Sequence, residues 1–66
     1  NYADAKIQIE KALSLSPNSA EVVEHYGDIC FRLGEKERAM NQWKKALELG
    51  SDSEELKKKV NTGLLP

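Results

Sequence analysis

The sequence has few of the residues that crosslink a chain or anchor it in a membrane. Cys30 is the single cysteine, so no internal disulfide can form and a metal site built from several cysteines is not expected. No apolar run approaches the roughly 18–20 residues that a membrane-spanning helix needs. The sequence therefore predicts no membrane insertion, and the fold must depend on the burial of apolar side chains.

An excess of charge is also missing. The 66 residues include 10 basic and 11 acidic ones, which gives a net charge of -1 at pH 7. A protein that binds DNA or RNA through counterion release needs a clear positive excess. We therefore do not expect nucleic acid as a partner.

What the chain does contain is typical of one small helical domain. Hydrophobic residues make up 39% of it and charged residues 32%, a composition that is ordinary for a helical protein. No segment alternates between apolar and polar residues as a half-buried strand does. The composition and the pattern together predict an all-α fold.

The chain also contains an internal repeat with a period of 34 residues. When the sequence is shifted by that period, six positions in the window 5–17 meet identical residues. The pairs are Ala5 with Ala39, Gln8 with Gln42, Lys11 with Lys45, Ala12 with Ala46, Leu13 with Leu47, and Leu15 with Leu49. A repeat of this length indicates stacked helix pairs.

Apolar residues recur at helical spacing in four stretches. The first three helices are expected at about 1–14, 19–33 and 36–49. A short fourth helix carries an apolar stripe made of Leu56, Val60 and Leu64. The linkers between them are only a few residues long, so neighbouring helices are predicted to lie antiparallel.

The helix ends have their own signals. Asn18 and, one period later, Asp52 are expected to cap the second and fourth helices through their side chains. Pro17 closes the first helix because the residue before a proline avoids helical geometry. Gly34 and Gly50 suit the left-handed residue that follows a helix.

Small residues at fixed positions predict close helix crossings. Gly27 and Ala39 have almost no side chain, so the two helices that carry them can approach each other closely. Ala12 and Ala46 allow the same for the next contact along. The ring of Trp43 then fills the wider gap between the helices.

These positions match a known pattern. The motif W-x2-L-G-x2-Y, followed by A-x3-F and a further alanine, fits Val23 to Ala46 at the right spacing, with Val23 and Cys30 in place of aromatic residues. The chain therefore resembles the tetratricopeptide repeat family. The resemblance implies the following packing residues: Ala5, Ile9, Ala12, Val23, Tyr26, Gly27, Cys30, Ala39, Trp43 and Ala46.

The resemblance also implies a domain organisation. Residues 1–17 correspond to the second helix of a partial repeat, residues 18–51 to one complete repeat, and residues 52–66 to a C-terminal capping helix. The expected architecture is thus a fragment of an α–α superhelix, or solenoid, of antiparallel helix-turn-helix units. The complete repeat is similar to the last repeat of bacterial family members, so both a cytoplasmic and a periplasmic or outer-membrane-associated location stay open.

No motif predicts catalysis. His25 lies within one helical turn of carboxylates, and we interpret it as a solvated surface residue. Cys30 falls on the packing face, where a buried thiol is inert. The sequence lacks a glycine-rich phosphate loop, a metal-ligand spacing and a Ser–His–Asp set. We expect a protein that is not an enzyme and holds no cofactor or metal.

The candidate binding residues come from the resemblance. In the family, the first helix of each pair lines a concave groove that takes peptides or partner helices. The side of this helix opposite its packing stripe carries six residues: Glu21, Glu24, His25, Asp28, Phe31 and Arg32. Its three carboxylates favour a basic or mixed-charge partner. Alternatively, the acidic residues are solvated, and Phe31 packs against a neighbouring repeat. The run 57–59, three lysines, is interpreted as solvated surface.

Two functions remain. The first is a non-catalytic scaffold for protein–protein interaction, which binds a peptide or partner protein on its concave face. The second is a structural element that caps a longer repeat protein or associates with itself, with recognition elsewhere. In the second case, a homodimer would form through the exposed N-terminal half-repeat.

Overall fold

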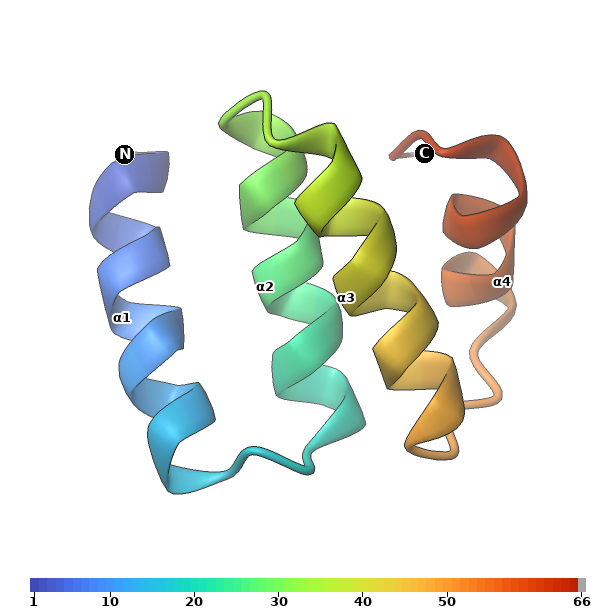
Figure 1. The fold of residues 1–66 in the computed structure, drawn as a ribbon, viewed down its shortest axis with the longest axis horizontal. Coiled ribbons are helices and arrows are strands. Elements are labelled where there is room, and N and C mark those ends of the chain that lie inside the picture. Colours follow the sequence, from blue (N-terminus) through green and yellow to red (C-terminus); the bar gives the residue numbers. More distant parts are fainter. Residues whose placement is uncertain (66) are drawn as a thin grey trace.

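The computed structural model describes residues 1–65, which form four α-helices and no strand. The helices are α1 (Tyr2–Leu15), α2 (Ala20–Arg32), α3 (Lys36–Glu48) and α4 (Glu54–Thr62). Each helix packs beside the one before it and runs antiparallel to it (Figure 1). The predicted all-α fold with four antiparallel helices is confirmed. None of the helices in residues 1–65 has the length and apolarity needed to cross a bilayer.

Serine residues cap α2 and α4, and this corrects the sequence-based expectation. The hydroxyl oxygens of Ser19 and Ser53 each accept a hydrogen bond of 3.3 Å from the backbone N–H three residues later. The expected caps, Asn18 and Asp52, each lie one residue too early. Ser19 and Ser53 are also one repeat period apart, so the repeat extends to the helix caps.

Glycine residues end three of the helices. Gly34 and Gly50 have φ angles of 84° and 104°, which a side chain would disfavour. Gly63, with φ of 71°, ends α4 in the left-handed region. Leu64 therefore leaves the helix axis, and it is 56% exposed. The prediction that Leu64 continues the apolar stripe of α4 is wrong.

The core lies between α2, α3 and α4. Its central residue is Trp43, which is completely buried. The other buried apolar residues are Val23, Tyr26, Cys30, Ala39, Ala46 and Leu56. All but one of them come from α2 and α3, so these two helices form the main packing unit.

The crossing of α2 and α3 is as close as the small residues predict. A β-carbon added at Gly27 would lie 2.6 Å from two atoms of the Trp43 indole and 3.2 Å from the carbonyl oxygen of Ala39. The lack of a side chain at Gly27 therefore makes room for the indole ring. The sequence predicted the close approach of Gly27 and Ala39, but it placed the Trp43 ring in a wider gap and did not predict the ring's contact with Gly27.

α1 packs less completely than its counterpart in the repeat. Ala5, Ile9 and Ala12 are half-buried, whereas the residues one period later, Ala39, Trp43 and Ala46, are fully buried. The reason is the number of neighbours. α3 lies between α2 and α4, whereas α1 lies at the end of the row, beside α2 (Figure 1).

Candidate functional site

The six candidate binding residues of α2 fall into two groups. Glu21, His25 and Arg32 are exposed to solvent. Glu24, Asp28 and Phe31 are half-buried because they face the helices that follow. The structure therefore does not present the six residues as one open surface.

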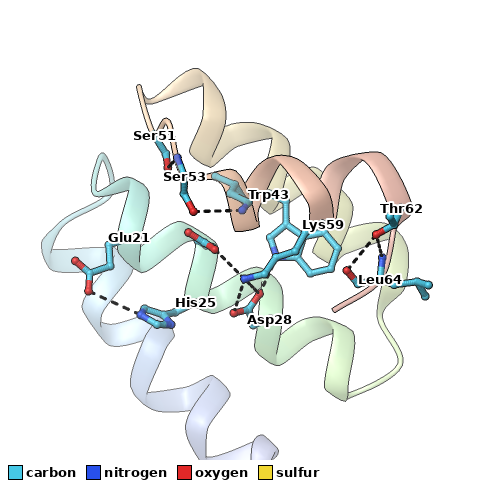
Figure 2. Close-up of polar contacts among 11 residues, drawn as sticks. Glu21, His25, Asp28, Trp43, Ser51, Ser53, Lys59, Thr62 and Leu64 are labelled. Carbon is cyan, nitrogen blue, oxygen red and sulfur yellow. Dashed lines mark hydrogen bonds and ion pairs between the residues drawn. The ribbon is translucent and has the colours of Figure 1, made fainter. Parts of the chain in front are cut away.

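A buried lysine joins two of these residues to α4. The Nζ atom of Lys59 lies 2.7 Å from Oε2 of Glu24 and 3.0 and 3.1 Å from the carboxylate oxygens of Asp28. The Lys59 side chain is only 6% exposed. Lysine has three N–H donors, so these contacts satisfy its hydrogen-bonding capacity. Figure 2 shows the ammonium group directed toward Asp28.

This contact corrects the interpretation of the three lysines at 57–59 as solvated surface. Lys57 and Lys58 are exposed, but Lys59 is buried. Lys59 follows Leu56 by three residues, so both lie on the face of α4 that packs against the core. Glu24 and Asp28 are four residues apart and likewise share one side of α2. These two spacings were the available signal, but they do not reveal which helix faces which.

Asp28 also connects α2 to α3. The indole Nε1 of Trp43 donates a hydrogen bond of 2.9 Å to Oδ1 of Asp28, which Lys59 also contacts. One carboxylate thus joins three helices (Figure 2). Among the described residues, no buried side-chain nitrogen or oxygen lacks a hydrogen-bond partner.

The ionisation of Lys59 reflects its partners. Burial alone lowers the pKa of a lysine, because it penalises the charged form. The hydrogen bonds and the negative charges of Glu24 and Asp28 outweigh that effect, so the pKa of Lys59 is raised above its ordinary value of 10.5. Lys59 is therefore a cation at neutral pH, and the two carboxylates near it are neutralised in part.

Phe31 packs on the neighbouring helix. Its ring centroid lies 5.8 Å from that of Trp43 at an interplanar angle of 31°, within the range of favourable aromatic pairs. The ammonium group of Lys36 lies 5.8 Å from the Phe31 ring centroid, near the outer limit of a cation–π contact. Phe31 thus has a side on α3 and a partly exposed edge.

A second polar cluster joins α1 to the other helices, and the sequence did not predict it. The hydroxyl of Tyr26 donates to Oε2 of Glu10 at 3.1 Å and accepts from Arg38 at 3.4 Å. Lys6 of α1 pairs with Glu35 at 3.2 Å. Burial raises the pKa of Tyr26. These contacts join α1 to α2 and to the residue that precedes α3.

The two residues considered for catalysis are His25 and Cys30. Nε2 of His25 lies 3.9 Å from Oε1 of Glu21, and the two side chains are 60% and 85% exposed. Cys30 is fully buried, and burial raises the pKa of its thiol, which disfavours the nucleophilic thiolate. Within residues 1–65, no group of three or more His, Cys, Asp or Glu side chains is arranged to hold a metal ion.

Comparison with other proteins adds no assignment. Neither protein-family models, nor curated proteins, nor solved structures give a match to this chain.

Proposed function

We propose that this chain is a tetratricopeptide-type module that binds a peptide or a partner protein on α2. The observation that carries the proposal is the close crossing at Gly27, at the motif position where the family also needs a small residue. The antiparallel order of the helices supports it. A helix pair held together by such packing leaves polar side chains of α2 available for recognition.

The exposed part of α2 is the proposed contact surface. Glu21, His25 and Arg32 carry both signs of charge and point to solvent. Their side chains are not needed for the core, so a partner can contact them without unfolding the chain. A mixed-charge segment would complement this surface.

Burial along α1 supports the idea of a longer array. Ile9 is half-buried, but Trp43, its counterpart one period later, is 0% exposed. A further helix on the free side of α1 would bring the burial of Ile9 closer to that of Trp43. In this proposal the chain is the C-terminal end of a stack, and the exposed residues Lys57, Lys58 and Asn61 of α4 form its outer, capping face.

Peptide selection tests the binding proposal. A displayed library of random linear peptides would be selected against the immobilised chain, and the affinities of selected peptides measured by calorimetry. We expect Glu21→Lys and Arg32→Glu to weaken binding about tenfold, or about 1.4 kcal/mol. Lys44→Glu, on the exposed side of α3, is the control and should leave affinity unchanged. Failure to select any peptide, or equal loss in the control, contradicts the proposal.

One observation favours the alternative function, self-association. Ile7 and Tyr2 of α1 are 54% and 50% exposed, and the packing residues of this helix are incompletely covered. A second copy could cover them. Sedimentation velocity over a range of concentrations tests this, with Ile7→Asp as the variant: a dimer that the variant dissociates supports self-association, and a monomer at all concentrations rejects it.

A further inference from the structure

One part of the α2 surface is covered by the chain itself. Two of the six candidate residues, Glu24 and Asp28, are in contact with α4 through Lys59. The occupant is a helix with a simple pattern, in which the buried Leu56 is followed three residues later by Lys59. In Figure 2 the side chain of Lys59 extends toward Asp28.

The surface beneath α4 has two features that match this pattern. The first is the apolar surface around Trp43, which lies in the core cluster that includes Leu56. The second is the pair of carboxylates, in which Asp28 is held by the indole N–H of Trp43 at 2.9 Å. Because Trp43 holds one carboxylate oxygen in place, the position for a cation does not depend on α4 alone. The surface is therefore suited to an aliphatic side chain and an ammonium group one helical turn apart.

α4 is also held by fewer buried side chains than the central pair of helices. It has nine residues and buries only Leu56 and Lys59, whereas α2 and α3 bury seven residues between them, four and three respectively. A helix of that length is unstable alone in water, so α4 is ordered by its docking. The short linker after Gly50 connects it to α3, and the α2–α3 crossing involves no residue of α4.

We propose that the partner of this module is an amphipathic helix that carries an aliphatic residue followed three residues later by lysine, and that it binds the α2–α3 surface in place of α4. α4 is then an internal ligand that keeps the site closed. This inference rests on the proposed binding function, and it names a partner and a form of regulation for the part of α2 that α4 covers. It also gives a role to the negative charge of Glu24 and Asp28. These carboxylates attract a basic partner helix most strongly after Lys59 has left them.

Competition by α4 sets the expected affinities. A segment tethered by a short linker has an effective concentration on the order of millimolar. A free helix with the same contacts must compete against it, so the intact chain should bind such a helix weakly. A variant whose α4 is released should bind the same helix at least about tenfold more tightly.

The test uses the full chain and a synthetic peptide with the sequence of residues 53–62, acetylated, amidated and fluorescently labelled. Binding is followed by anisotropy with three chains: wild type, Lys59→Glu, in which a third carboxylate repels α4, and Lys58→Glu as a control at an exposed neighbour. We expect tight binding to Lys59→Glu alone. A peptide with the Lys59→Met change should bind this chain at least about tenfold less well. Equal binding to all three chains, no binding to any, or no effect of the peptide change would overturn the inference.

A second measurement does not depend on a variant in the contact. A protease site inserted between Gly50 and Ser53 allows the linker to be cut while the contacts of α4 remain intact. The labelled peptide should then exchange with the cut segment, and no exchange at equilibrium would contradict the inference. Peptides selected against the wild-type chain test the proposed function separately: if they bind α2 while the α4 peptide binds no chain, the function stands and only this inference fails.

Discussion

Lys59 is the residue whose surroundings most affect the interpretation of this chain. A buried charge costs several kcal/mol unless its partners compensate for it. Here Glu24 and Asp28 supply that compensation with contacts of 2.7–3.1 Å. Removal of one partner leaves the others without a countercharge, and this loss exceeds the gain from forming the pair.

We therefore expect Lys59→Met to lower the free energy of unfolding by about 3 kcal/mol, the lower end of the range for a broken buried pair. The value is at the lower end because the side chains of Glu24 and Asp28 keep 20% and 29% of their exposure. Urea denaturation followed by the fluorescence of Trp43, the single tryptophan, measures it. Lys58→Met should change stability by less than about 0.5 kcal/mol; equal effects of the two changes would contradict the prediction.

Gly27 is the second residue with a specific prediction. Gly27→Ala should destabilise the chain by about 1–3 kcal/mol, because the new β-carbon would lie 2.6 Å from the Trp43 indole. On an exposed helix the same change would stabilise by about 1 kcal/mol, so the sign of the effect is diagnostic. In a double-mutant cycle measured by circular dichroism, Gly27→Ala should cost less stability in a Trp43→Phe background, because that change removes the crowded part of the ring. A stabilising Gly27→Ala would show that the helices do not cross closely here.

At the scale of elements, the docking of α4 includes a contribution from the positive charge of Lys59. The pKa of Lys59 is raised in the folded chain. Its contribution to stability is therefore complete below the pKa of the unfolded state and is lost as the pH rises through the higher folded value.

The expected result is a loss of α4 docking as the pH rises above about 10.5. Trp43 fluorescence and the circular dichroism of the helices would follow this loss between about pH 8 and about pH 12, a range that includes the titration of lysine. The pKa of Tyr26 is also raised, and it weakens the fold in the same alkaline range. The comparison is therefore with Lys59→Met, which should lack the part due to Lys59. Parallel curves for the two chains would show that Lys59 has no role.

At the scale of the whole molecule, stability is distributed unevenly along the chain. The core contains seven buried apolar residues, and six of these lie on α2 and α3. No residue of α1 is buried. The outer helices are thus held by fewer buried side chains than the central pair.

Native-state hydrogen exchange should reflect this distribution. Amide protons in α2 and α3 are expected to exchange at the rate of global unfolding, and those of α1 and α4 faster, through local opening. Site-resolved NMR exchange measures the difference. Uniform protection across all four helices would mean that the chain unfolds as a single unit, and the separable α4 would then lose its support.

Much of the fold follows from local pattern. Helical spacing and short linkers predicted four antiparallel helices, and Gly27 with Ala39 predicted the close crossing. The first residue of α2 follows less directly from the pattern, because Asn18 and Ser19 are adjacent and are both good capping residues. In the structure Ser19 is the cap.

The candidate site was less predictable. Glu24 and Asp28 were identified as a polar face, but their partner Lys59 lies 35 and 31 residues away. Within its own helix, Lys59 resembles the exposed lysines next to it.

The sequence by itself determined the helices, their order and the small residues at which two of them approach, since these depend on spacing along one segment. The tertiary structure decided which lysine is buried, which carboxylates it meets and how Trp43 joins them. Burial of a charge is a property of the partners around it, and these come from helices far apart in the chain whose relative rotation only packing determines.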